Sequence, residues 1–92
     1  MTVNICGIEH IIVECDDMFD NADLHLGQIN YGMCEIRINK NLSAPMKKET
    51  LCHEMLHGIL MHLGYEKEGS DEQFVQALAN AVSQSFEIKE IV

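Results

Sequence analysis

The segment Leu51-Cys52-His53-Glu54-Met55-Leu56-His57-Gly58-Ile59-Leu60 decides how this chain folds and what chemistry it offers. It places the pattern His-Glu-x-x-His inside an apolar stretch with helical spacing. Side chains four residues apart lie on one face of a helix, so both histidines can reach one metal ion, most often zinc. Glu54 is turned by about 100° from His53 around the helix axis. The pattern therefore predicts a metal site with Glu54 beside it as a general base.

The pattern fixes three positions in five and also occurs by chance, so a helix with ordinary histidines is the alternative interpretation. Two observations favour the metal site. The chain holds just five histidines, and two of them stand at this spacing in the middle of a helical stretch. Acidic residues also follow in a second helical segment, where they can supply a further ligand.

Size and charge limit the classes of function. The 92 residues are enough for one domain, residues 1–92, with a single core. No apolar run could span a bilayer and no secretory signal is visible, so a cytoplasmic protein is expected. The net charge of −9 would repel phosphate backbones, which argues against nucleic-acid binding and favours basic or neutral partners.

Four cysteines are present, without the Cys-x-x-Cys spacing that structural zinc sites usually show. Three of them, Cys6, Cys34 and Cys52, fall inside apolar periodic segments, where a free cysteine behaves as a small buried hydrophobe. We therefore expect reduced thiols in the core, in agreement with a reducing compartment.

The first half of the chain predicts a small antiparallel sheet of three to four strands. Residues 2–6 and 8–13 favour one hairpin around Gly7, and residues 28–31 and 34–39 favour a second. The acidic segment between them, residues 14–23, lacks the order of a calcium loop. It is expected to be a solvated loop or short helical turn with Met18 and Phe19 directed inward.

The second half predicts two helices, which makes the fold class α+β. Ser43 and Pro45 start the first helix, and Gly64 stops it. One face of this helix should pack on the sheet and carries Cys52, Leu56, Ile59, Leu60 and Leu63, while Glu49, His53 and His57 form the adjacent stripe. Residues 65–69 are expected to be a polar connection. A capping box of Ser70 and Gln73 starts the C-terminal helix, and residues 88–92 are a frayed tail.

A catalytic zinc usually has three protein ligands, so a third is required. The metzincin pattern would need glycine and histidine where Leu60 and Leu63 stand, and nothing ties His10, His25 or His62 to the metal. Asp71 and Glu72 remain, at the start of the C-terminal helix. The spacing alone does not choose between them, and both could instead stabilise the helix dipole.

The chain resembles the small gluzincin-like metallopeptidases of the ImmA/IrrE type, especially the short forms carried by phages and prophages. In that family a second helix resembling Glu-x-x-Ala-Asn-x-Phe-Ala follows the motif, and its first glutamate is the third zinc ligand. Residues 72–79, EQFVQALA, fit this frame with Gln76 in place of the asparagine. The resemblance extends to Gly27 and Tyr31 of the upstream strand and implies Glu72 as the ligand.

The expected function is that of a zinc-dependent peptidase, a hydrolase whose metal-activated water attacks a peptide bond while Glu54 takes the proton. In such families an exposed strand binds the substrate by strand addition, and Ile36 with its neighbours is a candidate. Tyr31 and Tyr65 are candidates for stabilising the oxyanion. The alternative is a non-catalytic, zinc-stabilised protein-interaction domain. A peptide or protein, such as a regulator protein, is the expected partner; its identity and the oligomeric state stay open.

Overall fold

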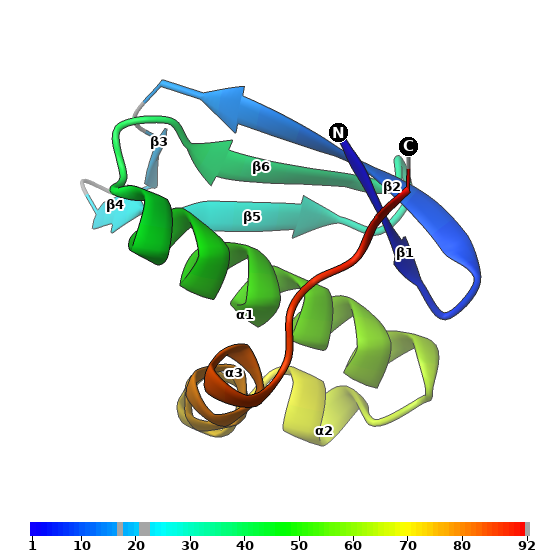
Figure 1. The fold of residues 1–92 in the computed structure, drawn as a ribbon. Helices are drawn as coiled ribbons and strands as arrows, with labels where there is room; N and C mark the ends of the chain where they lie inside the picture. The colour runs from blue at the N-terminus through cyan, green and yellow to red at the C-terminus, as the bar shows by residue number, and fades with distance from the viewer. Residues whose placement is uncertain (17, 21–22, 92) are drawn as a thin grey trace.

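The computed structural model describes residues 1–16, 18–20 and 23–91, arranged as a sheet with all three described helices on one of its faces (Figure 1). The sheet has the strand order β5-β6-β2-β1-β7. Its members are β1 (Thr2–Ile5), β2 (Ile8–Cys15), β5 (Gly27–Asn30), β6 (Glu35–Asn39) and the short β7 (Glu90–Ile91). The helices are α1 (Ala44–His62), α2 (Glu66–Gly69) and α3 (Glu72–Ser85). The expected α+β class is confirmed.

Both expected hairpins, β1–β2 and β5–β6, are present as antiparallel pairs. The sheet is nevertheless mixed, because β2 and β6 pair in parallel, with Ile12 opposite Ile36. The parallel pairing of β2 with β6 follows from the position of β5 at the outer edge of the sheet. The chain turns back from β5 into β6, and β6 therefore enters the sheet beside β2 in the same direction as β2.

The acidic segment is not the expected loop where the structure describes it. Residues Met18–Asp20 form β3 and residues Asp23–His25 form β4, and these two strands pair antiparallel as a separate sheet. The expected inward packing of Met18 and Phe19 lies outside the residues whose side chains are described.

Helix α1 begins and ends where the sequence predicts. Ser43 caps its N-terminus by accepting a hydrogen bond from the Met46 N–H, and Pro45 lies in the first turn. Gly64 follows the last turn with φ of +88°, a conformation that glycine adopts without strain. The helix that carries the motif is thus fixed at both ends.

Helix α1 is buried on two sides, by the sheet and by α3. On the sheet side, Leu51 packs with four strand residues, Val3, Ile5, Ile36 and Ile38. On the other side, Cys52 and Leu56 pack with Val75 and Ala79 of α3. The expectation that Cys52 and Leu56 face the sheet is therefore wrong, since a helix between two layers needs two apolar faces. Leu63, expected in the same face, is the C-terminal cap and is exposed.

All four cysteines are free, as expected, but Cys52 is the buried one. Cys6 and Cys34 were expected in the core and instead occupy the two hairpin turns with φ of 51° and 52°. Cys6 is exposed and Cys34 partly so. The alternating pattern places them beside strand residues but does not reveal where each strand ends.

Three further boundaries differ from expectation. Residues 66–69 form the one-turn helix α2 instead of an irregular connection, and Asp71, not Ser70, caps α3. The C-terminal segment is not a frayed tail. It crosses α1 on its way to β1 (Figure 1), where β7 pairs with Thr2 and Val3. Ile88 of this segment packs against both apolar clusters.

None of the described helices is long and apolar enough to cross a membrane.

The two faces of the sheet should differ in their contribution to stability. Ile36 on β6 is fully buried under α1, whereas Ile11 on the neighbouring β2 is 54% exposed. We expect Ile36→Ala to lower the free energy of unfolding by about 2–5 kcal/mol, and Ile11→Ala by less than about 1 kcal/mol. Urea denaturation of both variants measures this; equal costs would contradict the placement of the core.

Candidate metal centre and cleft

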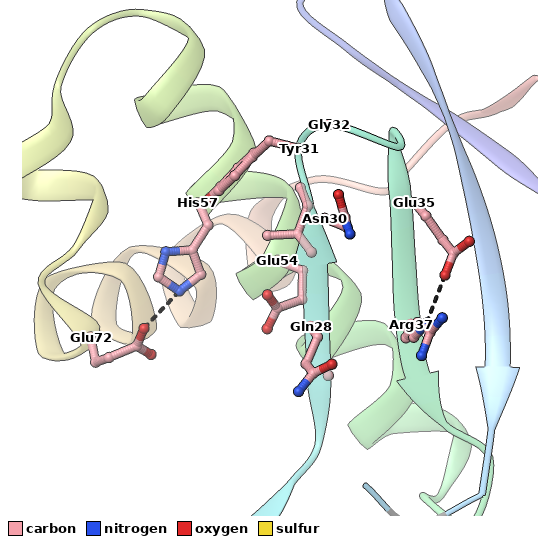
Figure 2. Close-up of a pocket in the computed structure, with 11 residues that line it drawn as sticks. Gln28, Asn30, Tyr31, Gly32, Glu35, Arg37, Glu54, His57 and Glu72 are labelled. Carbon is pink, nitrogen blue, oxygen red and sulfur yellow. Dashed lines mark hydrogen bonds and ion pairs between the residues drawn. The ribbon is translucent and has the colours of Figure 1, made fainter. Parts of the chain in front are cut away.

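A cleft of about 1090 Å³ runs between β5 and the helices (Figure 2). Its strand side is formed by the continuous segment from Gly27 to Gly32, and its helix side by Glu54, His57 and Glu72. A smaller hollow of about 360 Å³ continues the cleft past Gly27 toward the start of α1. The two hollows share Gly27, Glu54 and Glu72, so these residues lie where the cleft passes the predicted metal site.

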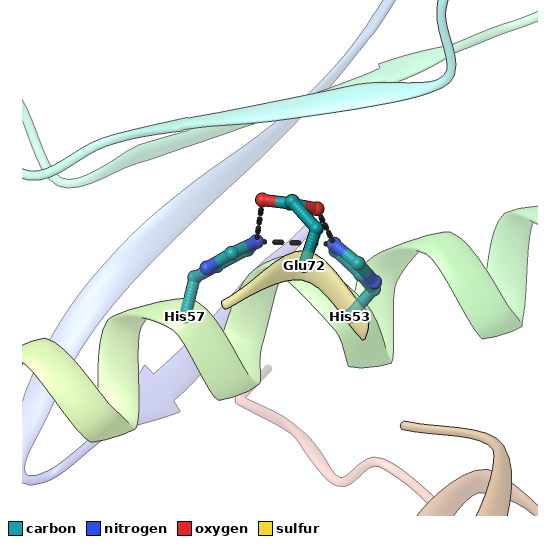
Figure 3. A group of neighbouring side chains, drawn as sticks. All are labelled: His53, His57 and Glu72. Atoms are coloured by element: carbon teal, nitrogen blue, oxygen red, sulfur yellow. Dashed lines mark hydrogen bonds and ion pairs between the residues drawn. The ribbon is translucent and has the colours of Figure 1, made fainter. Parts of the chain in front are cut away.

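Two helices bring three side chains together at this point (Figure 3). His53 and His57 stand one turn apart on α1, and Glu72 is the first residue of α3. One carboxylate oxygen of Glu72 lies 3.0 Å from His53 Nε2 and the other lies 2.9 Å from His57 Nε2. The two Nε2 atoms are 3.0 Å apart. The group has the composition and compactness of one that could hold a metal ion.

Hydrogen bonds fix the orientation of both rings. His57 Nδ1 lies 2.6 Å from the carbonyl oxygen of Gly69, and His53 Nδ1 lies 2.8 Å from the side-chain oxygen of Gln76. These oxygens accept only, so each Nδ1 carries a hydrogen and donates it. In a neutral ring the Nε2 atom then presents a lone pair. Both lone pairs therefore point at each other and at the Glu72 carboxylate, an arrangement of acceptors that a shared cation stabilises.

The spacing of these acceptors fits a small metal ion. Two ligands that each lie about 2.0–2.1 Å from a tetrahedral zinc ion are about 3.3 Å apart. The three separations among His53 Nε2, His57 Nε2 and the nearest Glu72 oxygens are 2.9–3.0 Å. A shift of a few tenths of an ångström would admit the ion. Glu72 is free to make it, because its side chain is 72% exposed.

A chain of side chains holds Gln76 in the orientation that His53 needs. The amide nitrogen of Gln76 donates to Glu49 Oε1 at 2.7 Å and to Asn80 Oδ1 at 3.0 Å. Since both partners are acceptors, the Gln76 oxygen must face His53. The sequence identified Gln76 only as a departure from the family pattern. Its position four residues after Glu72, on the same helix face, is the signal that could have indicated a role at the site.

The structure places Glu72, and not Asp71, beside the histidines. Asp71 is the N-cap of α3, and its carboxylate accepts a hydrogen bond from the Phe74 N–H at 3.0 Å. This cap directs the following residue into the first helical turn. Of the other histidines, His10 and His62 line a separate hollow, and the side chain of His25 lies outside the described residues.

Glu54 occupies the floor of the cleft between α1 and β5. Its side chain is 8% exposed, and the pKa of its carboxyl is raised to about 7, chiefly by burial; His57 acts to lower this pKa and the Glu72 carboxylate acts to raise it. The missing side chain at Gly27 leaves the space beside Glu54 open. A Cβ at Gly27 would lie 2.7 Å from the Thr50 methyl and 3.3 Å from Glu54 Cγ. A glycine at this place lets the strand approach the carboxylate closely.

Among the described strands, β5 is the last in the order of its sheet, so it presents a free edge to the cleft. Hydrogen-bonded pairs alternate along an antiparallel ladder. The Asn39 N–H donates to the Leu26 carbonyl oxygen, so every second residue from Leu26 pairs with β6. The backbone groups of Gly27 and Ile29 therefore point to the free edge. Ile36, the candidate substrate strand residue in the sequence, is wrong for this role, since it lies on the internal strand β6 and is fully buried.

The two tyrosines have different positions. Tyr31 lines the cleft with Glu54 and His57, and burial together with the Glu54 and Glu72 carboxylates raises the pKa of its phenol. Tyr65 is exposed at the start of α2, beyond the described lining of the cleft. Tyr31 is thus the better placed of the two candidates.

No protein-family model, curated protein or solved structure matches the chain significantly. The resemblance to the ImmA/IrrE type stays a prediction from the motifs.

The buried Glu54 carboxylate should destabilise the metal-free fold in a pH-dependent way. Its pKa is about 7 in the folded chain against 4.5 for an ordinary glutamate. Below about pH 4.5 the carboxyl is neutral in both states; stability is lost as the pH rises through the folded pKa, and the full cost of about 3 kcal/mol applies above it. We expect Glu54→Gln to stabilise the chelator-treated protein by about 1–3 kcal/mol near pH 8 and by much less near pH 4.

Denaturant unfolding at the two pH values measures this difference. Glu9→Gln, at an exposed position on β2, is the matched control for loss of one negative charge. An effect of Glu54→Gln that is independent of pH would show that desolvation of the carboxylate is not its cause.

Proposed function

We propose that the chain is a zinc-dependent peptidase, a hydrolase of peptide bonds. The observation that carries the proposal is the convergence of two imidazole lone pairs and a carboxylate at one point, each ring locked by a hydrogen bond at its other nitrogen. Such locking is typical of histidines that bind metal. The resemblance to the ImmA/IrrE type, including its short phage forms, supports the same function.

His53 and His57 would hold the zinc ion through Nε2, and Glu72 through its carboxylate. Two imidazoles and one carboxylate are a donor set used at catalytic zinc sites, which keep a position open. Zinc, when bound there, makes water nucleophilic at neutral pH and polarises a carbonyl group. Structural zinc sites favour closed, cysteine-rich sets. The buried cysteine, Cys52, instead donates to the Ala79 carbonyl of α3.

Glu54 would act as the general base. Its carboxylate accepts a proton from the attacking water and returns it to the leaving amine of the substrate. The pKa of about 7 applies to the metal-free chain. A zinc ion at the neighbouring ligands would lower it and favour the carboxylate form that a base requires. A buried carboxylate costs stability, and a peptidase offers a reason to keep it that a purely structural site does not.

The free edge of β5 would bind the substrate as an added strand. The outward backbone groups of Gly27 and Ile29 can pair with an extended peptide, whose path then passes Glu54 and the metal ligands. An extended segment of a cytoplasmic protein, such as a regulator protein, has the required form. The net charge of −9 favours a basic or neutral one.

Replacement of the two neighbouring acids tests the metal site. We expect about one zinc per chain in the wild type and at least a tenfold loss of zinc affinity in Glu72→Ala, because one of three ligands is removed. Asp71→Ala should keep its zinc and lose about 1 kcal/mol of stability with the helix cap. Elemental analysis and chelator competition give the affinities. A metal-free wild type, or zinc loss in Asp71→Ala alone, would contradict the assignment.

Replacement of the base tests catalysis. A peptide library digested with the zinc-loaded wild type, and analysed by mass spectrometry, identifies a cleaved sequence. Glu54→Gln should keep its zinc and cleave this sequence about 10²- to 10⁴-fold more slowly, whereas Glu9→Gln should cleave it at the wild-type rate. Undiminished cleavage by Glu54→Gln would exclude Glu54 as the base. Zinc binding without any cleavage by the wild type would favour the non-catalytic interaction domain.

A further inference from the structure

A second hollow adjoins the metal centre at the start of α1. It has a volume of about 360 Å³, and it meets the main cleft at Gly27 and Glu54. A side chain that enters it would therefore belong to a substrate residue next to the bond at Glu54. The walls and the floor of this hollow differ in chemistry, and together they define what fits.

The walls are apolar. Leu26, just before β5, and Met46, in the first turn of α1, both line the hollow with exposed fractions of 39% and 37%. Thr50 also lines the hollow, with its methyl group next to Gly27. Large apolar side chains that stay partly exposed beside a catalytic cleft can cover the aliphatic part of a bound side chain.

The floor is acidic. Glu49 is partly buried, and its Oε1 accepts the Gln76 amide hydrogen at 2.7 Å. A carboxylate has about four lone-pair sites, so Glu49 can accept further hydrogen bonds from a substrate. Glu54 and Glu72 also line the hollow, and none of its described lining residues is lysine or arginine. The neighbouring lysines of α1 do not line this hollow: Lys47 forms an ion pair with Glu14, and Lys48 lines two other hollows.

We propose that this hollow is the subsite for the substrate residue directly after the cleaved bond, and that it selects lysine or arginine. The inference rests on the proposed peptidase function. A long basic side chain places its aliphatic stem between Leu26 and Met46 and its cation at Glu49. An acidic side chain is repelled by the Glu49 carboxylate, and a short apolar one forms no ion pair with it.

The assignment to the residue after the bond follows from strand direction. Antiparallel pairing is the slightly more stable arrangement, so a peptide on the free edge runs opposite to β5. β5 runs from Gly27 to Asn30, and the hollow lies at its Gly27 end. The C-terminal part of the substrate therefore reaches the hollow, while the N-terminal part lies toward Tyr31.

The variant Glu49→Gln separates charge from structure. Glutamine keeps a side-chain oxygen that can accept from Gln76, so the zinc content should stay at about one per chain. Two peptides are compared that differ only in lysine or glutamine after the cleaved bond. We expect the wild type to prefer lysine in kcat/KM, and Glu49→Gln to lose about tenfold of this preference, the scale of one hydrogen bond to a charged group. Glu9→Gln is the control and should keep the preference.

A second variant changes the charge at the apolar wall of the hollow, at Met46. Met46→Lys places a cation at the rim of the hollow and should shift the preference from lysine toward glutamate at the same substrate position. Library cleavage without a basic preference after the bond, or with that preference before it, would overturn the proposal while the peptidase function stands. An unchanged lysine preference in zinc-loaded Glu49→Gln would overturn it too. If the zinc-loaded wild type cleaves no peptide, the peptidase function fails first, and this inference fails with it.

Discussion

The confinement of α1 between the sheet and α3 is the constraint on which the site depends. Leu51 packs against the strands and Cys52 against α3, so two adjacent residues of one helix are fixed by two different layers. This double packing leaves the helix little freedom to rotate. His53 and Glu54, the next two residues, consequently emerge in set directions, the first toward α3 and the second toward β5. The separation of the proposed ligand His53 from the proposed base Glu54 thus follows from the two layers that cover the helix.

The same packing sustains a group of side chains that is unfavourable in the metal-free chain. Acceptor atoms of three side chains converge within about hydrogen-bond distance, and a carboxylate with a pKa near 7 is buried beside them. Each feature lowers stability in the metal-free chain. The opposing stabilisation comes from the two apolar clusters, both of which Ile88 contacts, and from the pairing of β7 with β1. A chain of 92 residues has a small free energy of unfolding. Zinc binding would increase it by stabilising the folded state.

The sequence predicted those parts of the fold that local patterns determine. The 3.6-residue period and the Ser43 cap located α1, and alternation located the two hairpins, because these signals act between near neighbours. It did not predict the parallel pairing of β2 with β6 or the pairing of β7 with β1, since both join segments far apart in the chain. The histidine pair was predictable from helical spacing, but the choice of Glu72 over Asp71 needed the family resemblance. Periodicity alone does not reveal which of two adjacent acids caps the helix.

Gln76 shows why the supporting contacts were harder to predict than the ligands. Glutamine extends one carbon further from the backbone than the asparagine of the family pattern, and here it spans from His53 to Glu49. The acid that orients it lies a full turn before His53 on α1, so the contact joins residues 27 positions apart. Glu49 therefore contacts the Gln76 amide, which orients the ring of His53, and it also lines the hollow beside Met46. A cation bound in that hollow would also interact with the carboxylate that accepts from Gln76. The charge of a bound ligand and the orientation of His53 would then be coupled through Glu49.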